Sequence, residues 1–335
     1  MRPTRRSSRR SVLAVGVVVL ALALTGCGSA GPGAAPSGSA GASPATLTIT
    51  DPTGREVTVP AEPKAALGFY TTDVDILITL GIPLATLQPI RGDSGYTTFP
   101  AFFPQDALRG VSTFANYPEY SFEKVLEANP DFILNGLGYD NKTLDRLPEI
   151  APTYSVNAFD GQDWRVHFKE TAAALGRTAQ YEAWSRQYDE QLTRAKADIA
   201  ATAAKNWTVA SISYWDNSIQ LGCYGVSCRT LKNDLQLTTP ALMDKEEAKL
   251  SAEQFGQLSD IDAVFMSIGV GEQGLKAHQE LLAELDKIPT WRTLPFVKNQ
   301  RIYTYEMEME YGSPSGQTAL VEAMRKALVE GAAQS

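Results

Sequence analysis

Residues 179–204, AQYEAWSRQYDEQLTRAKADIAATAA, carry the longest helical pattern in this chain of 335 residues. Apolar and aromatic side chains recur there at helical spacing, at Tyr181, Trp184, Tyr188, Leu192, Ala195 and Ile199. A helix of this length extends roughly 35–40 Å at about 1.5 Å per residue, enough to cross from one domain to another. The helical pattern begins near Gln162 and is broken once, at Gly176-Arg177-Thr178. It predicts a stiff helical connection between two halves of the chain.

Strand and helix patterns alternate on both sides of this connection. The first half is expected to hold strands at 47–50, 56–60, 65–69, 84–87 and 131–134, and helices at 74–80 (N-cap Asp73) and 121–128. The second half is expected to hold strands at 209–212, 263–266 and 301–305, and a closing helix at 317–329. Such alternation predicts α/β structure with mostly parallel sheets. We therefore expect two Rossmann-like lobes, 47–160 and 206–335, joined by the single long rigid helix of a linker at 161–205.

The first 26 residues have the pattern of a secretory signal peptide. Five arginines in the first ten positions precede an apolar run at 12–24, too short to span a bilayer as a mature helix. The run ends in Leu24-Thr25-Gly26-Cys27, which resembles a bacterial lipobox and implies a lipid on Cys27. An ordinary signal peptide ending near a cysteine is the alternative, and residues 8–13 also resemble a twin-arginine signal. We expect an extracytoplasmic protein, lipid-anchored to the cell membrane, with 27–46 as a flexible tether.

The charge balance excludes one large class of partner. The formal net charge is −8, and it becomes −13 once the five arginines of the signal peptide are removed. A chain this acidic does not suit nucleic acid, because phosphate binding needs positive charge. It does suit docking onto a basic face of another protein.

The cysteines point to a disulfide rather than to a metal site. Cys223 and Cys228 lie five positions apart in a glycine-containing segment, and in an oxidising compartment we expect them to pair, with two free thiols as the alternative. The two histidines, His167 and His278, are far from the cysteines and from each other. No cluster has the spacing of metal ligands, so no metal site is predicted.

A set of short motifs follows the same order as in a known family. The motifs are Asp51-x-x-Gly54-Arg55, Val57-x-Val59-Pro60, Asp75-x-Leu77-x-x-Leu80-Gly81, Ser121-Phe122-Glu123-Lys124-Val125-Leu126, Asn129-Pro130-Asp131-Phe132-Ile133-Leu134, Ile150-Ala151-Pro152-Thr153, Leu250-Ser251-x-Glu253-x-Phe255 and Pro289-x-Trp291-x-x-Leu294-Pro295-Phe296-Val297-Lys298-Asn299-x-Arg301-Ile302-Tyr303. Together they resemble the substrate-binding lipoproteins of ABC importers for iron-siderophores, haem and cobalamin. The resemblance implies a class III periplasmic binding protein, whose ligand is held in a cleft between two lobes that move little.

The resemblance also implies two residues that dock a permease dimer. In this family a glutamate on the outer surface of each lobe pairs with arginines of the permease, and Glu123 and Glu253 stand at the matching positions. One carboxylate on each lobe gives a contact that sets orientation. The alternative role is stabilisation of a helix N-terminus by each carboxylate. We expect a monomer whose partners are a ferric siderophore, the permease dimer and, through Cys27, the membrane.

The cleft residues are expected at the carboxyl ends of the strands, where ligands of doubly wound sheets bind. The loops there are dense in aromatic side chains, which suit an amphipathic ligand. The predicted ligand contacts are Tyr70, Arg91, Tyr96, Tyr139, Tyr214, Trp215, Tyr224, Arg229 and Tyr311. Trp215 and Tyr214, beside the expected disulfide, are the leading candidates; packing of the lobes is the alternative role for each aromatic residue.

The charges in these loops indicate what kind of ligand fits. Arg91 and Arg229 are outnumbered by Asp93, Asp216 and the run Glu306-Met307-Glu308-Met309-Glu310, which favours a neutral or cationic ligand. We therefore expect a ferric hydroxamate of the ferrioxamine kind. Its iron arrives already chelated, so no protein cofactor is expected. Haem, with Tyr70 or Tyr214 as a possible axial ligand, and cobalamin remain open.

One motif suggests an enzyme instead. Residues 269–274, GVGEQG, match the G-x-G-x-x-G pattern of dinucleotide-binding sites between an expected strand and an expected helix at 275–285. The acidic residue that should hold the ribose about twenty positions later is missing, because Glu306 comes too late. A hydrolase with Glu306 or Glu308 as its carboxylates is no better supported. We therefore predict a binding protein that is not an enzyme and interpret these glycines as a loop.

Overall fold

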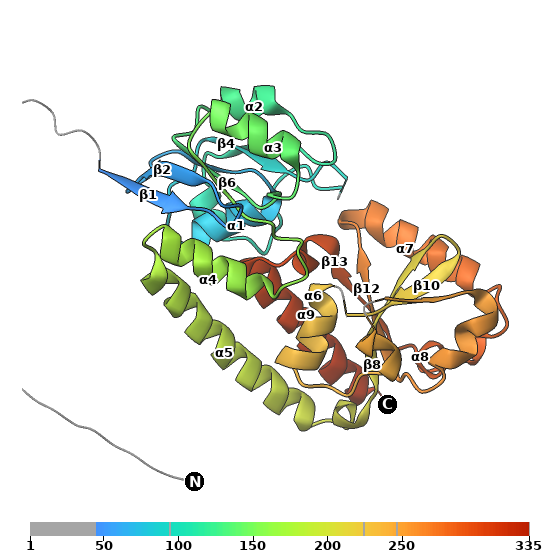
Figure 1. The fold of residues 1–335 in the computed structure, drawn as a ribbon. Helices are drawn as coiled ribbons and strands as arrows, with labels where there is room; N and C mark the ends of the chain where they lie inside the picture. Colours follow the sequence, from blue (N-terminus) through green and yellow to red (C-terminus); the bar gives the residue numbers. More distant parts are fainter. Residues whose placement is uncertain (1–44, 94, 224, 246, 335) are drawn as a thin grey trace, which may run out of the picture. The chain divides into compact units, whose positions relative to one another are not determined.

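The computed structural model describes residues 45–334 except Ser94, Tyr224 and Glu246. The predicted signal peptide, Cys27, nearly all of the predicted tether and the predicted ligand contact Tyr224 therefore lie outside the described residues. Within the described part, no helix is both long enough and apolar enough to cross a membrane. Figure 1 shows two α/β lobes, joined at one side by helices α4 and α5.

The N-terminal lobe begins with the predicted hairpin and continues as parallel sheet. Strands β1 (Thr46–Thr50) and β2 (Glu56–Pro60) pair antiparallel, with Leu47 opposite Val59. The parallel strands lie in the order β3-β6-β7, and a second parallel pair is formed by β4 and β5. Their bounds are β3 Ala66–Gly68, β6 Phe132–Asn135, β7 Thr153–Ser155, β4 Leu87–Ile90 and β5 Ser112–Ala115, and the helices are α1 Thr71–Thr79, α2 Phe122–Glu127 and α3 Asn141–Arg146.

Strands β5 and β7 and helix α3 were not predicted, and two predicted elements differ in their details. Helix α1 is capped by Tyr70, not by Asp73, whose carboxylate accepts hydrogen bonds from the backbone N–H groups of Tyr70 (2.9 Å) and Gly136 (2.8 Å). Asp73 thus belongs to the first turn and ties it to the end of β6. The strand predicted at 84–87 begins only at Leu87. Leu84 forms an isolated bridge with Ala66 of β3, and the continuous pairing of β4 with β5 starts at Leu87.

The linker contains two helices, α4 (Trp164–Ala174) and α5 (Thr178–Ala200). The predicted break is present, because Gly176 takes a φ of 67° in the left-handed region that glycine tolerates. Tyr181 and Trp184, near the start of α5, pack against the N-terminal core, whereas Tyr188 and Ile199 are buried in the C-terminal core. Trp184 contacts both cores, so α5 crosses from one lobe to the other.

The C-terminal lobe combines a parallel sheet with an antiparallel one. The strands are β8 (Val209–Ser211), β12 (Ala263–Ile268) and β13 (Ile302–Glu306) in the parallel order β13-β12-β8, and β9 (Ser213–Trp215), β10 (Ser218–Leu221) and β11 (Ala248–Leu250) in the antiparallel order β11-β10-β9. The helices are α6 Val226–Arg229, α7 Gly271–Leu285, α8 Pro295–Lys298 and α9 Pro314–Ala333. Much of the segment 214–229, which we expected to be loop, therefore consists of β9, β10 and α6.

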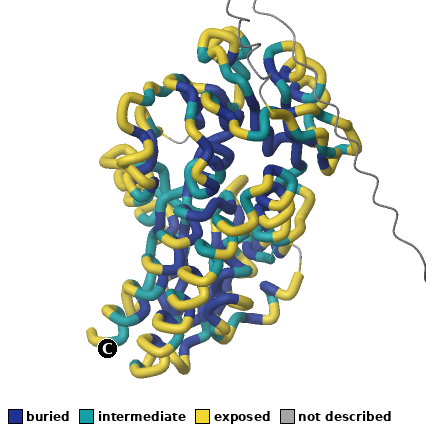
Figure 2. The backbone as a smooth tube through the Cα atoms, turned by 90° about the vertical axis from the view of Figure 1, so that its left-hand side faces the viewer, coloured by how far each residue is buried: buried dark blue, intermediate teal, exposed yellow. Residues whose placement is uncertain are grey.

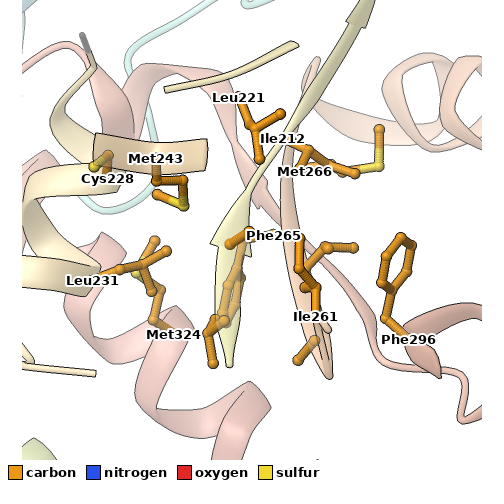
Figure 3. Close-up of a cluster of buried hydrophobic side chains, with 14 of the residues drawn as sticks. Ile212, Leu221, Cys228, Leu231, Met243, Ile261, Phe265, Met266, Phe296 and Met324 are labelled. Atoms are coloured by element: carbon orange, nitrogen blue, oxygen red, sulfur yellow. The ribbon is translucent and has the colours of Figure 1, made fainter. Parts of the chain in front are cut away.

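Apolar side chains from both sides of the parallel sheet build the C-terminal core. Phe265 of β12 is fully buried, with Met324 of α9 and Phe296 of α8 on either side of it (Figure 3). Figure 2 shows the same pattern along the chain, with buried backbone inside each lobe and exposed turns outside. The remaining short helices are η1 Gln105–Leu108, η2 Leu147–Glu149, η3 Ala203–Asn206, η4 Thr230–Asp234, η5 Ala241–Asp244, η6 Ala252–Leu258, η7 Trp291–Thr293 and η8 Met307–Glu310.

The start of α9 forms a second connection between the lobes. The backbone N–H of Ser315 donates a 2.6 Å hydrogen bond to Asp75 Oδ2 on α1, and Asp75 is completely buried. Helix α9 also packs along α5, as Figure 1 shows at the lower left. The lobes are thus held by α5 and by the contact of α9 with α1.

Candidate functional site

A pocket of about 820 Å³ opens at the carboxyl ends of the C-terminal parallel strands. Ser211 ends β8, Ser267 lies near the end of β12, and Tyr305 and Glu310 follow from β13 and η8. The remaining wall comes from β9, β10 and the turn that leads into α6. The lining residues are Ser211, Ile212, Ser213, Gln220, Leu221, Gly222, Gly225, Ser227, Glu247, Ser267, Tyr305 and Glu310. This C-lobe pocket lies where ligands bind in doubly wound sheets.

Hydroxyl groups and one carboxylate form the floor of the C-lobe pocket. The Tyr305 hydroxyl donates a 2.6 Å hydrogen bond to Glu310 Oε2, and Ser267 donates a second bond to the same carboxylate. The hydroxyls of Ser211 and Ser227 lie 2.9 Å apart, and both also interact with Tyr305. Burial raises the pKa of Glu310, which the two donated bonds only partly offset.

The predicted disulfide is present at one wall of this pocket. Cys223 and Cys228 are joined, with their Cα atoms 5.1 Å apart. Three residues of the wall, Gly222, Gly225 and Ser227, lie inside or directly beside the closed loop. The disulfide therefore restrains the backbone that shapes the pocket.

The N-terminal lobe has a pocket of its own, of about 930 Å³. It lies beyond the carboxyl ends of β4 and β5 and is lined by two tyrosines, a phenylalanine and charged residues of α2 and α3. The lining residues are Gly92, Asp93, Ala115, Asn116, Tyr117, Pro118, Glu119, Tyr120, Ser121, Phe122, Glu123, Lys142 and Arg146. Each of the two large pockets is thus formed by residues of a single lobe.

A buried ion-pair cluster joins the lobes at Arg91. Its guanidinium donates two 2.8 Å hydrogen bonds to Asp93, approaches Glu308 Oε1 at 3.4 Å and lies 4.2 Å from the centre of the Tyr311 ring. Glu308 is 2% exposed, and burial raises its pKa to about 7 although Arg91 acts in the opposite direction. Tyr70, also buried, stacks edge-on against Tyr311. The predicted ligand contacts Tyr70, Arg91 and Tyr311 are therefore packed together between the lobes.

The three glutamates of the predicted acidic run have three different partners. Tyr96 of the N-terminal lobe donates its hydroxyl proton to a hydrogen bond with Glu306, Glu308 faces Arg91, and Glu310 points into the C-lobe pocket. The 3-10 geometry of η8 separates the three side chains. Only Glu310 of the run lines a large pocket.

None of the predicted ligand contacts that the structure describes lines either large pocket. Trp215 lies on the same face of β9 as the lining residue Ser213, because side chains alternate along a strand, and it is 73% exposed. Tyr214 faces the other way and packs against the C-terminal core. Tyr139 stacks on Phe159 at 5.8 Å, and Arg229 donates a hydrogen bond to the Gly161 carbonyl.

None of the twelve residues that line the C-lobe pocket was a predicted ligand contact, and four of them are serines. Ser211 and Ser267 lie at the ends of strands whose cores were predicted, so the carboxyl-end rule could have found them. Ser213, Gln220 and Glu247 lie on or beside antiparallel strands that were not predicted.

The residues predicted to dock a permease are both at the surface. Glu123 is exposed on α2 at the edge of the N-lobe pocket, and Glu253 is exposed on η6. A hydrogen bond from Ser251, together with the local backbone N–H, lowers the pKa of Glu253. Both side chains are available to a partner.

Of the glycines in residues 269–274, which we interpreted as a loop, Gly269 lies between β12 and α7, whereas Gly271 and Gly274 lie in the first turn of α7, which begins four residues before the predicted 275. Gly271 has a φ of 68°, and a Cβ atom on Gly274 would lie 1.7 Å from the Gly269 carbonyl oxygen. The close approach of this backbone explains the glycines.

Comparisons with known proteins agree with this architecture. The sequence matches the periplasmic binding protein family over residues 69–308. It is 25% identical over 296 residues to the iron-uptake system-binding protein of Bacillus subtilis (87% of this chain, 89% of that protein). It is 24% identical over 320 residues to the iron(3+)-hydroxamate-binding protein YxeB of the same organism (90% and 91%).

Solved structures share the fold. Unliganded FhuD2 from Staphylococcus aureus superposes with a TM-score of 0.66 at 16% identity, covering 86% of this chain and 100% of that one. The same protein with bound ferrioxamine B gives a TM-score of 0.60 at 16% identity, covering 81% and 100%. With its two lobes, its crossing helix and a family match over most of its length, the chain belongs to the periplasmic binding protein family.

Proposed function

We propose that this chain is an extracytoplasmic solute-binding lipoprotein that captures a ferric siderophore of the hydroxamate type and delivers it to an ABC permease. The observation that carries the proposal is the C-lobe pocket, whose volume of about 820 Å³ falls in the range of small-molecule sites. Its relatives include a protein named for iron(3+)-hydroxamate binding, which supports the ligand class.

The lining of the pocket suits a hydroxamate complex. Serine hydroxyls and Gln220 offer both donors and acceptors to amide and hydroxamate oxygens on the outside of such a ligand. A siderophore satisfies its iron with its own oxygens, so the protein needs to bind only the organic shell. Strongly anionic catecholates are disfavoured, because no Lys, Arg or His occurs among the described lining residues.

The positions of two tyrosines favour a siderophore over haem. The tyrosines considered as axial ligands are not presented to a pocket, since Tyr70 is 3% exposed beneath the Arg91 cluster and Tyr214 packs on the core.

Release to the permease is assigned to Glu123 and Glu253, one exposed carboxylate on each lobe. The lipid on Cys27 would keep the protein at the membrane where the permease lies.

A ligand screen tests the proposal. The purified protein is titrated with ferrioxamine B, a ferric catecholate, haem and cyanocobalamin while tryptophan fluorescence is recorded. We expect saturable quenching by ferrioxamine B, with a Kd on the order of a micromolar or tighter, and none by the catecholate. Tight binding of haem or cobalamin without binding of any hydroxamate would overturn the proposal.

Three substitutions refine the same experiment. Trp215→Phe should remove much of the quenching, because this exposed indole stands on the pocket face of β9. Trp215→Ala should also weaken binding by isothermal calorimetry, whereas Tyr214→Phe should not. Unchanged affinity of Trp215→Ala would place the ligand away from β9.

A further inference from the structure

The charges of the C-lobe pocket point to a specific chemical group on its ligand. We infer that Glu310, on the floor, and Glu247, on the rim, form a subsite for a protonated amine, so that the protein selects a siderophore with a cationic end. This inference rests on the proposed function and deepens it, because it names a group that the ferric centre itself does not supply.

The first argument is the absence of a compensating cation in the described part of the chain. Neither Glu310 nor Glu247 forms an ion pair with a described residue, and the described lining residues include no basic side chain. The arginine that influences Glu310, Arg91, is itself engaged by Asp93 and Glu308. The pocket therefore holds negative charge that the described chain does not neutralise.

The second argument is the environment of Glu310. Its carboxylate is largely buried and hydrogen-bonded to neutral hydroxyls, those of Tyr305 (2.6 Å) and Ser267. Removing a carboxylate from water is unfavourable unless an opposite charge or strong donors replace the water. Two hydroxyls are weaker compensation than a cation, so a positive group that enters the pocket would gain from the charge already held there.

The third argument is the geometry of the neighbouring acceptors. The hydroxyl oxygens of Ser211, Ser227 and Ser267 lie in the same pocket as Glu310. An ammonium group has three donors, and a carboxylate together with serine oxygens provides acceptors for all of them. Glu247 is exposed at the mouth, where it would attract the same cation before it enters.

A purely structural role for Glu310 predicts something different. If the carboxylate only holds Tyr305 in place, its loss would weaken binding of cationic and neutral ligands alike. If it binds an amine, its loss would weaken binding of the cationic ligand alone. The two roles are therefore separable by a pair of ligands with the same iron centre.

The experiment compares ferrioxamine B, which carries a free amine, with its N-acetylated form, which is neutral and otherwise the same. Isothermal calorimetry on the purified protein should show the amine form bound roughly tenfold to a hundredfold more tightly, as expected for a charged hydrogen bond. Glu310→Gln should bind both forms as weakly as the parent binds the acetylated one. Glu247→Gln should reduce the preference by a smaller factor, and Glu272→Gln, an exposed control on α7, should leave it unchanged.

The possible results distinguish the amine subsite from the proposed siderophore function. Equal affinity of the parent for both forms, or an unchanged preference in Glu310→Gln, overturns the amine subsite while the siderophore function stands. Equal weakening of both ligands in Glu310→Gln assigns Glu310 to support of Tyr305 and likewise overturns the subsite. Failure of the parent to bind either form contradicts the proposed ligand class and the subsite together. Retained binding of the acetylated form shows that Glu310→Gln is folded.

Discussion

The carboxylate of Asp75 in α1 accepts a 2.6 Å hydrogen bond from the backbone N–H of Ser315 at the start of α9. The two residues are 240 positions apart and belong to different lobes. Burial raises the pKa of Asp75, and hydrogen bonds from Ser313 and Ser315 oppose that shift. The contact connects the lobes on a path independent of α5.

Asp75→Ala should destabilise the protein by about 2–3 kcal/mol, because it leaves the Ser315 N–H buried without an acceptor. Asp75→Asn should lose less, since its amide oxygen can still accept that bond. Guanidinium unfolding followed by circular dichroism measures both. Equal stability of Asp75→Ala and the parent would mean that the contact contributes nothing to the free energy of unfolding.

The raised pKa of Glu308 should make the free energy of unfolding depend on pH. Its pKa is raised to about 7 in the folded protein, so the folded state holds a proton that the unfolded state releases near pH 4.5. The free energy of unfolding therefore falls as pH rises between these values, and the loss is complete above about pH 7. Glu308→Gln lacks this titration. The free energy of unfolding of the variant, taken relative to that of the parent, should therefore rise by about 3 kcal/mol as the pH rises from about 4 to 8.

The groups around Glu308 are Arg91, Asp93 and Glu310, and they stay in place in this variant. Chemical unfolding at several pH values supplies the comparison, with the exposed Glu284→Gln as the matched control. A stability difference that does not vary with pH would show that Glu308 has the same pKa in the folded and unfolded states.

Glu123→Ala combined with Glu253→Ala should abolish siderophore uptake by cells and leave the affinity of the purified protein unchanged. Both carboxylates are exposed, and each lies on a different lobe. The control is Glu127→Ala with Glu284→Ala, which removes two exposed glutamates from the same lobes. Uptake that survives the first pair of substitutions would limit Glu123 and Glu253 to a role at their helix ends.

Replacing Cys223 and Cys228 by serine should lower stability by about 2 kcal/mol, the amount expected for a short closed loop. It should also weaken ligand binding several-fold, because Gly222, Gly225 and Ser227 of the pocket wall lie in or beside that loop. Calorimetric binding and thermal unfolding measure the two effects. A reducing agent should reproduce both in the parent and neither in the double variant; an unaltered affinity in both would separate the disulfide from the binding site.

The sequence predicted the long elements well because their patterns are long. Helix α5 begins one residue before the predicted 179, and its apolar stripe from Tyr181 to Ile199 spans about five turns, long enough to identify the helix. The predicted end, at 204, is four residues beyond the observed end at Ala200. The alanines after Ile199 carry no periodic signal, and the 3-10 helix η3 follows at Ala203–Asn206. The short strands β5 and β7 were not predicted, because three or four residues leave few alternations; β3, β6 and β8 are as short, but continuous apolar runs identified them.

The binding pocket was harder to predict for a related reason. Aromatic residues drew attention to the correct loops, but rings such as Tyr70 are large enough to pack between the lobes instead. Four of the twelve lining residues of the pocket are serines, whose small side chains have no periodic signature. One clue was missed: Asp216 and Asn217, with φ of 49° and 54°, form the turn that makes a hairpin of β9 and β10 and places Ser213 at the pocket.

The position of Trp184 has a thermodynamic consequence. Its indole packs against Phe168 and Trp164 on one side and against Tyr188 on the other, so a single side chain covers both hydrophobic cores. Unfolding of either lobe would therefore expose apolar surface of the other lobe to water. Heat should therefore denature residues 45–334 in one cooperative transition, with equal calorimetric and van't Hoff enthalpies, as for a protein half its size.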